Sequence, residues 1–438
     1  MSAPTRPTSG RTSRRTFLKR SSAALAGAAL LPDAAPARGR ALGDDEIRIA
    51  LVGCGGRGTG AAIQALNTAG PVRLVAMADA FEDRLAESHA YLAEAHPERV
   101  DVPPERRYVG FDAYERALDD DVDLVVLATP PGFRPIHFEL AVERDKHVFM
   151  EKPVAVDGPG VRRVLAASEE SKRRGLKVGV GLQRHHEARY VETVRRIRDG
   201  AIGAIRLLRC YWNSSGVWVK PREEGQSEME HQMRNWYYFN WLCGDHVVEQ
   251  HIHNLDVCNW IQGAYPVSAQ GQGGRQVRTG AEYGEIYDHH MVELTYADGT
   301  TLLSQCRHQK GCWSSVSEHA SGAEGRADVS AGVIESRGET WRFRGENPDP
   351  YQIEHDRLFE AVRRDLEHHE ADNGARSTMT AILARMATYS GQVVSWDDAL
   401  ASGLALVPSA YAWDGIPPSV PDADGNYPIA IPGLTRAY

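Results

Sequence analysis

Two segments far apart in the chain carry side chains suited to moving a proton to or from a hydroxyl group. The first is Glu151-Lys152-Pro153, which follows the apolar run His147–Met150. A lysine at the carboxyl end of a strand can polarise or protonate the oxygen of an alcohol or ketone. The same three residues also fit a surface Glu-Lys pair at a turn, so position alone leaves both interpretations open.

The second segment is Glu249-Gln250-His251-Ile252-His253-Asn254-Leu255-Asp256. On one helix, Glu249, His253 and Asp256 fall at i, i+4 and i+7, and we expect them to share a face. An imidazole titrates near neutral pH, and a carboxylate can orient it. His253 is therefore a candidate general base with Glu249 as its partner, and a helix of core histidines is the alternative.

A glycine-rich stretch, Gly53-Cys54-Gly55-Gly56-Arg57-Gly58, fits the G-x-G-x-x-G pattern of a dinucleotide-binding turn. It follows a β-rich run and opens a predicted helix, whose first N–H groups can hold a pyrophosphate. Asp79 ends the next apolar run, where its carboxylate can accept hydrogen bonds from both ribose hydroxyls and repel a 2′-phosphate. NAD is therefore expected rather than NADP, although Arg57 can offset this preference by pairing with a phosphate.

Histidines are frequent in the second half of the chain, which makes a metal centre an alternative there. The residues concerned are His246, His251, His253, His289 and His290. Their spacing suits no standard zinc pattern, and hydride transfer to NAD needs no metal. We therefore expect no metal site.

Strands alternate with helices in the first half of the chain and position these candidate residues. We predict strands at 47–52, 72–78, 122–128, 147–150 and 176–180, and helices at 59–69, 81–95, 114–118, 135–144 and 161–174. This alternation indicates parallel βαβ units, and the near-continuous apolar strands indicate a sheet covered on both faces. An α/β Rossmann domain is predicted at residues 46–182.

The pattern changes after Gln183. We predict strands at 205–212, 291–296 and 301–305, with Asp298-Gly299 as a hairpin turn between the last two, and helices at 351–366 and 377–394. A second, α+β domain with much antiparallel sheet is therefore expected at residues 183–400. Residues 401–438 are expected to form an extended tail, because the chain from Pro408 is rich in Pro, Gly and Asp.

Charge and cysteine usage narrow the possible partners. The net charge of −9 argues against nucleic acid or an anionic membrane surface, because both select a basic face. Six cysteines are scattered without a CxxC pair, which is unlike a disulfide framework or a structural zinc site. Cys306 and Cys312 are the two that can pair if the protein is exported.

Residues 1–37 read as a targeting segment. Ser13-Arg14-Arg15-Thr16-Phe17-Leu18-Lys19 is a twin-arginine pattern, an apolar stretch follows, and Ala35-Pro36-Ala37 is a cleavage pattern. The apolar stretch is too short to span a bilayer, and no later stretch qualifies. We expect a protein exported by the twin-arginine route to the periplasm or beyond, with no membrane insertion of the mature chain.

Together these segments resemble the glucose-fructose oxidoreductase / inositol dehydrogenase / rhizopine catabolism (Gfo/Idh/MocA) family, from Ile47 to about Leu400. The resemblance is carried by the glycine turn with Asp79, Ala128-Thr129-Pro130 through His137, the run Lys146-His147-Val148-Phe149-Met150-Glu151-Lys152-Pro153, and His253-x-x-Asp256. The leader and the Pro-rich tail are similar to a secreted branch of that family.

The resemblance implies a Rossmann domain and a large open, mostly antiparallel sheet that forms the interface of a homo-oligomer, a dimer or tetramer. It implies that Lys152 contacts nicotinamide ribose and substrate. Glu249 and His253 match the family's D-x-x-x-H pair, with Glu where Asp is usual. Cofactor contacts are expected from Gly53, Gly55, Gly56, Arg57, Gly58, Asp79, Thr129, Pro130, Glu151, Lys152 and Gln183, and substrate contacts from Arg184, His185, Tyr237 and Asp256.

The leading functional hypothesis is an NAD-dependent oxidoreductase that acts on a carbohydrate, a sugar or polyol, with Lys152 and His253 managing the hydroxyl proton. Aromatic residues suited to a sugar ring, or simply to a core, are Trp212, Trp218, Trp236, Tyr237 and Trp241. One alternative is a redox-neutral glycosidase or lyase that oxidises its substrate transiently. A non-catalytic binding protein is the other alternative, and the glycine turn, Lys152 and His253 together argue against it.

Overall fold

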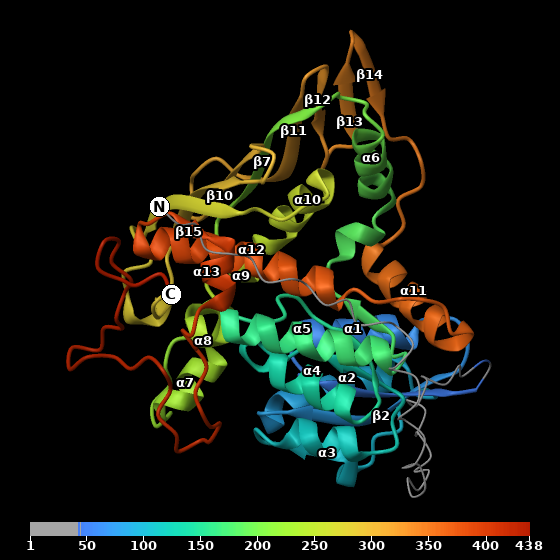
Figure 1. The fold of residues 1–438 in the computed structure, drawn as a ribbon. Coiled ribbons are helices and arrows are strands. Elements are labelled where there is room, and N and C mark those ends of the chain that lie inside the picture. Colours follow the sequence, from blue (N-terminus) through green and yellow to red (C-terminus); the bar gives the residue numbers. More distant parts are fainter. Residues whose placement is uncertain (1–42, 44) are drawn as a thin grey trace, which may run out of the picture. The chain divides into compact units, whose positions relative to one another are not determined.

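A computed structural model describes residue 43 and residues 45–438 (Figure 1). The predicted signal peptide lies outside the described residues. The first sheet is parallel, in the order β3-β2-β1-β4-β5-β6. Its strands are β1 Ile47–Val52, β2 Val72–Asp79, β3 Arg107–Val109, β4 Leu124–Leu127, β5 His147–Met150 and β6 Val178–Val180. This confirms the predicted Rossmann-type sheet.

Helices cover both faces of this sheet. They are α1 Gly56–Leu66, α2 Glu82–Ala95, α3 Ala113–Asp119, α4 Arg134–Glu143 and α5 Gly158–Arg173, with short 3₁₀ turns η1 Pro104–Arg106 and η2 Pro131–Phe133. Strands β4 and β5 are buried along their whole length, as the near-continuous apolar runs predict. Only β3, a short edge strand with polar residues, escapes prediction from the sequence.

The second sheet is larger and mostly antiparallel. Within the described residues it has nine strands, in the order β14-β13-β12-β11-β7-β10-β9-β8-β15, and only β7 and β10 pair in parallel. The strands are β7 Ile205–Ser214, β8 Ser268–Gly274, β9 His289–Thr295, β10 Thr301–His308, β11 Ser315–Gly322, β12 Gly325–Asp328, β13 Val333–Ser336, β14 Glu339–Arg342 and β15 Val394–Ser395. The predicted hairpin between β9 and β10 and the predicted open sheet are both confirmed.

The second half also contains helices that join the two sheets. They are α6 Ala188–Arg198, α7 Glu228–Arg234, α8 Asn240–Cys243, α9 His246–Glu249, α10 Ile252–Gln262, α11 Pro350–Arg364, α12 Ala371–Ser390 and α13 Trp396–Ala401, with 3₁₀ turns η3 Gln183–His186, η4 Trp236–Tyr238 and η5 Ala281–Tyr283. Helix α12 contacts both α5 and strands β8 and β9, so it lies between the first layer of helices and the inner face of the second sheet (Figure 1).

Helix α11 belongs by sequence to the second half but packs on the first sheet. Its buried side chains Leu358, Phe359 and Val362 join one hydrophobic cluster with strand β1 and helix α1, and α11 lies beside α1 in Figure 1. Each such buried side chain stabilises the fold by about 1.5–3 kcal/mol. The first sheet is therefore completed by helix α11, which begins at residue 350, although the last strand of that sheet ends at residue 180.

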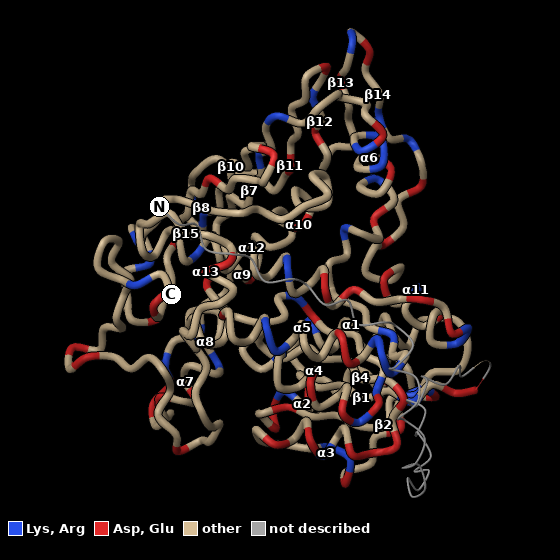
Figure 2. Tube along the Cα trace, viewed as in Figure 1, with Lys and Arg blue, Asp and Glu red and all other residues tan. Residues whose placement is uncertain are grey.

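The tail after α13 runs along α7 and α8 without helix or strand of its own (Figure 1). The Tyr427 hydroxyl donates to Glu228 at 2.6 Å, and Gln232 donates to the Ser419 carbonyl oxygen at 2.6 Å. Acidic and basic residues are interspersed along the described chain, as Figure 2 shows. None of the helices in residues 45–438 is long and apolar enough to cross a bilayer.

Candidate active site

The glycine turn connects β1 to α1 and leaves room for a ligand at two positions. Gly53 has φ +97°, and a Cβ there would lie 2.6 Å from the carbonyl carbon of Ala128. A Cβ on Gly58 would lie 1.8 Å from the Gly53 carbonyl oxygen, so packing alone requires glycine at both sites. Gly55 and Gly56, in contrast, have nothing within 4 Å of an added Cβ. The free N-terminus of α1, which no side chain caps, borders this open space and fits a pyrophosphate.

Asp79 ends β2 at the mouth of the same turn. Its Oδ2 accepts the Cys54 N–H at 2.6 Å, and its Oδ1 accepts the Phe81 N–H at 2.9 Å. Burial raises the pKa of this carboxyl group, and the two N–H donors oppose that shift. Each oxygen keeps a second lone pair, so both can still accept hydrogen bonds from ribose hydroxyls, as the sequence predicts.

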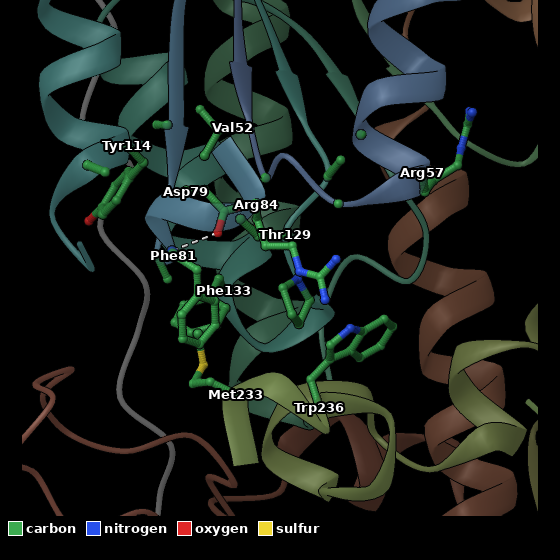
Figure 3. A pocket seen from close by; sticks show the side chains of 18 of the residues that line it. Val52, Arg57, Asp79, Phe81, Arg84, Tyr114, Thr129, Phe133, Met233 and Trp236 are labelled. Carbon is green, nitrogen blue, oxygen red and sulfur yellow. Dashed lines mark hydrogen bonds between the residues drawn. The ribbon is translucent and has the colours of Figure 1, made fainter. Parts of the chain in front are cut away.

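A cavity of about 590 Å³ extends from the glycine turn past Asp79 (Figure 3). Thr129 and Pro130 line it as expected, while Lys152 and His253 do not, and its place beside the glycine turn and Asp79 fits the adenosine side of NAD. The sequence analysis missed several side chains that line it. They are Phe81, Arg84, Phe111, Phe133 and Lys220, and Trp236, one of the aromatic residues named from the sequence, also lines the cavity.

Of these missed residues, Arg84 points into the cavity from α2, five positions after Asp79 (Figure 3). Within the described residues, its one ion pair is a loose 3.6 Å contact with the exposed Glu87. Trp236 and Lys220 come from the second half of the chain, which therefore covers the cavity of the first. The sequence signal for this residue is a basic side chain, Arg84, shortly after the acidic Asp79.

Arg57 lines the cavity as expected, but its guanidinium is held by the protein, and its pairing with a phosphate stays a prediction. Figure 3 shows its side chain pointing away from Asp79. Its guanidinium binds Glu151 at 2.5 Å and Glu354 of α11 at 3.4 Å, over the ring of Tyr351. Two carboxylates already satisfy this cation, so it ties the glycine turn to α11.

Lys152 is held by Glu249 across the crevice. Its Nζ lies 2.9 Å from Glu249 Oε1 and 2.7 Å from the Glu249 carbonyl oxygen. Both side chains are about nine-tenths buried, at 13% and 11% exposure. Because Glu151 is anchored by Arg57, the segment that carries Lys152 is fixed on both sides.

His253 is separated from Glu249 by a break in the helix, so the prediction that one helical face carries Glu249, His253 and Asp256 is wrong. Helix α9 ends at Glu249 and α10 begins at Ile252. The His253 ring makes no side-chain hydrogen bond within the described chain, its Nδ1 is buried, and it stacks on Trp212. Burial, reinforced by the charge of Lys152, lowers the pKa of His253 well below its usual value.

Tyr237 is the substrate candidate whose polar atom stays free. Its hydroxyl is buried and has no hydrogen-bond partner within the described chain. Burial, and next the charge of Glu249, raise the pKa of this phenol well above its usual value. Its O–H is therefore a neutral donor close to the Lys152–Glu249 pair. Trp241, in contrast, is a core residue with 1% exposure.

The other predicted substrate contacts are engaged inside the protein. Arg184, which is predicted to contact the substrate, forms a buried ion pair with Glu318. Asp256 is 1% exposed and accepts hydrogen bonds from His185 at 2.8 Å, Ser377 at 2.7 Å and Asn373 at 3.0 Å. Asp256 thus holds His185 and does not face the crevice.

Two further predictions concern Gln183 and the cysteines. Gln183 donates to the Tyr351 hydroxyl at 3.2 Å, beside Arg57, while its buried Oε1 has no partner within the described chain. Cys306 is buried and Cys312 is exposed, and both are free thiols, so the pairing considered from sequence is not formed here.

Comparisons with known families agree with this geometry. A family model described as "Oxidoreductase family, NAD-binding Rossmann fold" matches residues 47–181. A second model, described as "GFO/IDH/MocA C-terminal domain", matches residues 190–312. Together the two models span more than half of the chain.

Individual relatives are distant. The scyllo-inositol 2-dehydrogenase (NAD(+)) of Bacillus subtilis (strain 168) is 25% identical over 227 residues, which are 52% of this chain and 57% of that protein. The chain therefore spans little more than half the length of this curated relative.

Solved structures share the fold. An aldose-aldose oxidoreductase from Caulobacter crescentus, complexed with glycerol, superposes with a TM-score of 0.64 at 20% identity and covers 80% of this chain and 99% of its own. A levoglucosan dehydrogenase in complex with NADH and levoglucosan gives a TM-score of 0.63 at 15% identity, with the same coverage. At these identities the likeness establishes the fold alone.

Proposed function

We propose that this chain, which belongs to the Gfo/Idh/MocA family of oxidoreductases, oxidises a hydroxyl group of a sugar or polyol with NAD as the hydride acceptor. The observation that carries the proposal is the Lys152–Glu249 pair beside a neutral His253, at the end of a crevice whose glycine turn fits a pyrophosphate. The names of the B. subtilis relative and of the two solved structures support a carbohydrate substrate.

In this proposal each residue acts on the substrate hydroxyl in a defined way. Lys152 donates a hydrogen bond to its oxygen, and the neutral imidazole of His253 takes up its proton. Glu249 keeps the ammonium of Lys152 in place, and the Tyr237 O–H orients a neighbouring hydroxyl. When bound, the nicotinamide supplies the hydride acceptor.

The direct test is turnover with a defined substrate panel. Purified protein is mixed with NAD and, separately, with inositols, aldoses and an anhydrosugar, and reduced cofactor is followed by absorbance. Steady reduction with at least one compound supports the proposal. If all are inert while aryl glycosides release phenol, the redox-neutral alternative is correct.

That alternative, an NAD-dependent glycosidase or lyase, has one feature in its favour. The predicted twin-arginine leader would send the folded protein to a compartment without a maintained pool of free NAD. A redox-neutral reaction, or a second substrate that reoxidises the cofactor, then needs a cofactor that stays bound. Lys152 favours the dehydrogenase, because the glycosidase branch of the family lacks this lysine.

Export itself is part of the proposal. A fusion of residues 1–45 to a reporter that is active only when exported folded should give signal, and Arg14→Lys with Arg15→Lys should abolish it. Signal that survives the double substitution would remove the twin-arginine route from the proposal.

We further infer a homo-oligomer that uses the outward face of the second sheet. Met291, Gln305 and Tyr211 lie side by side on that face, and Met291 is an exposed apolar side chain. Met291→Glu with Tyr211→Glu should reduce the mass measured by light scattering, whereas Leu366→Glu, at an exposed apolar residue outside the sheet, should not.

A further inference from the structure

Three metal-ligating side chains meet in the interior behind the crevice. Asp245 and His246 stand at the start of α9, and His290 comes from β9. Asp245 and His246 are fully buried, and His290 is 3% exposed. One donor atom from each residue lies within 4.8 Å of the other two. Asp245 Oδ1 is 2.8 Å from His246 Nδ1 and 3.2 Å from His290 Nε2.

The hydrogen bond from Nδ1 of His290 to Thr388 leaves its second ring nitrogen facing the carboxylate of Asp245. The Thr388 hydroxyl donates to a backbone carbonyl of its own helix, that of Arg385 at 3.0 Å or Ala384 at 3.2 Å. Its oxygen therefore accepts from His290 Nδ1, at 2.9 Å. In the neutral ring, Nε2 is then an acceptor that faces a second acceptor, Asp245 Oδ1. Such a contact is repulsive unless a cation, either a proton on Nε2 or a metal ion, lies between the two atoms.

His246 points to the same conclusion independently. It is the only histidine of the described residues whose two ring nitrogens are both buried without a hydrogen-bond partner. An imidazole whose two nitrogens have no hydrogen-bond partner, with Nδ1 2.8 Å from a carboxylate oxygen, is the arrangement expected of two ligands of one metal ion.

Neighbouring groups hold the carboxylate of Asp245 in place. Its Oδ2 accepts the Tyr389 hydroxyl and the Tyr287 N–H, at 2.5 and 2.9 Å. The residue has φ +76°, a conformation that costs a non-glycine residue free energy. Thr388 plays the same supporting part for His290. Partners of this kind commonly orient the ligands of a metal ion.

We propose that Asp245, His246 and His290 bind one divalent transition-metal ion, with Zn²⁺ the best match to a carboxylate and two neutral imidazoles. The ion would be a positioning element, because His246 begins the short helix α9 whose last residue, Glu249, holds Lys152. This last clause rests on the proposed function, whereas metal binding itself does not. Sequence spacing could not reveal the site, since His290 lies on a strand far along the chain.

The experiment measures metal in the full-length protein, purified without a histidine tag and without chelators. Elemental analysis should give about one equivalent of zinc per chain. His246→Asn and His290→Gln should each lower that content at least tenfold. His355→Gln, which changes an equally buried histidine in α11, should keep it. Growth in cobalt should give the visible absorption of bound Co²⁺ in the wild type and in His355→Gln only.

A second measurement covers variants that fail to fold. Extraction of the wild type with dipicolinate should lower its melting temperature by several degrees, and added Zn²⁺ should restore it. Wild-type protein that holds no metal, takes up neither Zn²⁺ nor Co²⁺ and melts at the same temperature with both would overturn the proposal. The cluster would then be an imidazolium–carboxylate pair of His290 and Asp245. Failure of turnover with all sugars would leave the metal result unaffected.

Discussion

The ammonium group of Lys152 touches Glu249 twice, at 2.9 Å to the side-chain carboxylate and at 2.7 Å to the backbone carbonyl. These two residues come from different halves of the chain, so their contact closes the crevice at its reaction end. The carboxylate expected to orient His253 orients the lysine instead. Glutamate reaches one methylene further than the aspartate usual in the family.

Removal of the Lys152 amine should abolish turnover but leave NAD binding largely unchanged. Lys152→Met keeps the length of the side chain and deletes its charge and donors, so we expect at least a 10³-fold loss of kcat. Binding of NAD, followed by fluorescence, should change little, because the cavity for the adenosine side does not include this residue. Lys172→Met, at an exposed position of helix α5, is the matched control.

Neutralisation of Glu249 should reduce kcat less than removal of the Lys152 side-chain amine does. In Glu249→Gln the backbone carbonyl and an amide oxygen can still accept from Lys152, and we expect a loss of about tenfold in kcat. Glu249→Asp shortens the side chain by one methylene, and its kcat should lie between those of Glu249→Gln and Lys152→Met. A Glu249→Gln enzyme as inactive as Lys152→Met would mean that Glu249 itself carries the proton.

His253 should act as a base at lower pH than an ordinary histidine. Its pKa is lowered in the folded protein, and a base works when neutral. The acid limb of kcat/KM should therefore lie below pH 6.5, the usual value for histidine, and activity should persist at pH 6. His253→Ala should reduce kcat by about 10²–10⁴-fold and remove that limb. A limb at or above pH 6.5 would contradict the assignment.

Asp79 should set the choice between NAD and NADP. In Asp79→Ala the acceptor for the ribose hydroxyls and the negative charge both disappear, while Arg84 remains to attract a 2′-phosphate. We expect weaker NAD binding and a tenfold or larger shift of the KM ratio toward NADP, a factor that corresponds to about 1.4 kcal/mol. The double variant Asp79→Ala/Arg84→Ala should not show this shift of the KM ratio toward NADP. Unchanged selectivity in Asp79→Ala would place the ribose elsewhere.

The tail should slow cofactor release. Trp413 packs on Phe111 and Phe81, at 4.5 and 5.1 Å between ring centroids, and both phenylalanines line the cavity. Trp413→Ala should loosen this wall and raise the rate of NAD release by about tenfold in stopped-flow measurements. Leu434→Ala, at a highly exposed position of the same tail, is the control. Equal release rates in wild type and Trp413→Ala would exclude a clamp.

The sequence predicts the first sheet well because local signals suffice there. Apolar runs such as Val148–Met150 are buried on both faces, and glycine spacing reports a turn that packing enforces at Gly53 and Gly58. The second half is harder, because strands β11 to β14 carry many polar residues, and β11 joins the sheet through β7, far back in the chain, before β12 to β14 follow as local hairpins.

In the candidate site, too, some residues can be predicted from the sequence, and others only from the fold. Lys152, His253 and Asp79 are found from sequence because each ends or follows a recognisable element. The residues that these side chains contact cannot be found from sequence in the same way. Periodicity, for example, cannot show that the helix stops at Glu249 and restarts at Ile252. Likewise Arg184 carries the expected type of side chain, and only the fold shows that Glu318 neutralises it.

Helix α11 also constrains the order in which the molecule can be made. One face of the cofactor-binding sheet gains Leu358, Phe359 and Val362 only after residue 364 has left the ribosome. Strand β6, the last strand of that sheet, ends at Val180, well before α11. At about 5–20 residues per second, the interval lasts roughly 10–40 s. During translation, helices α1 and α2 therefore cover that face only in part, and the remaining apolar surface is available to chaperones until α11 arrives.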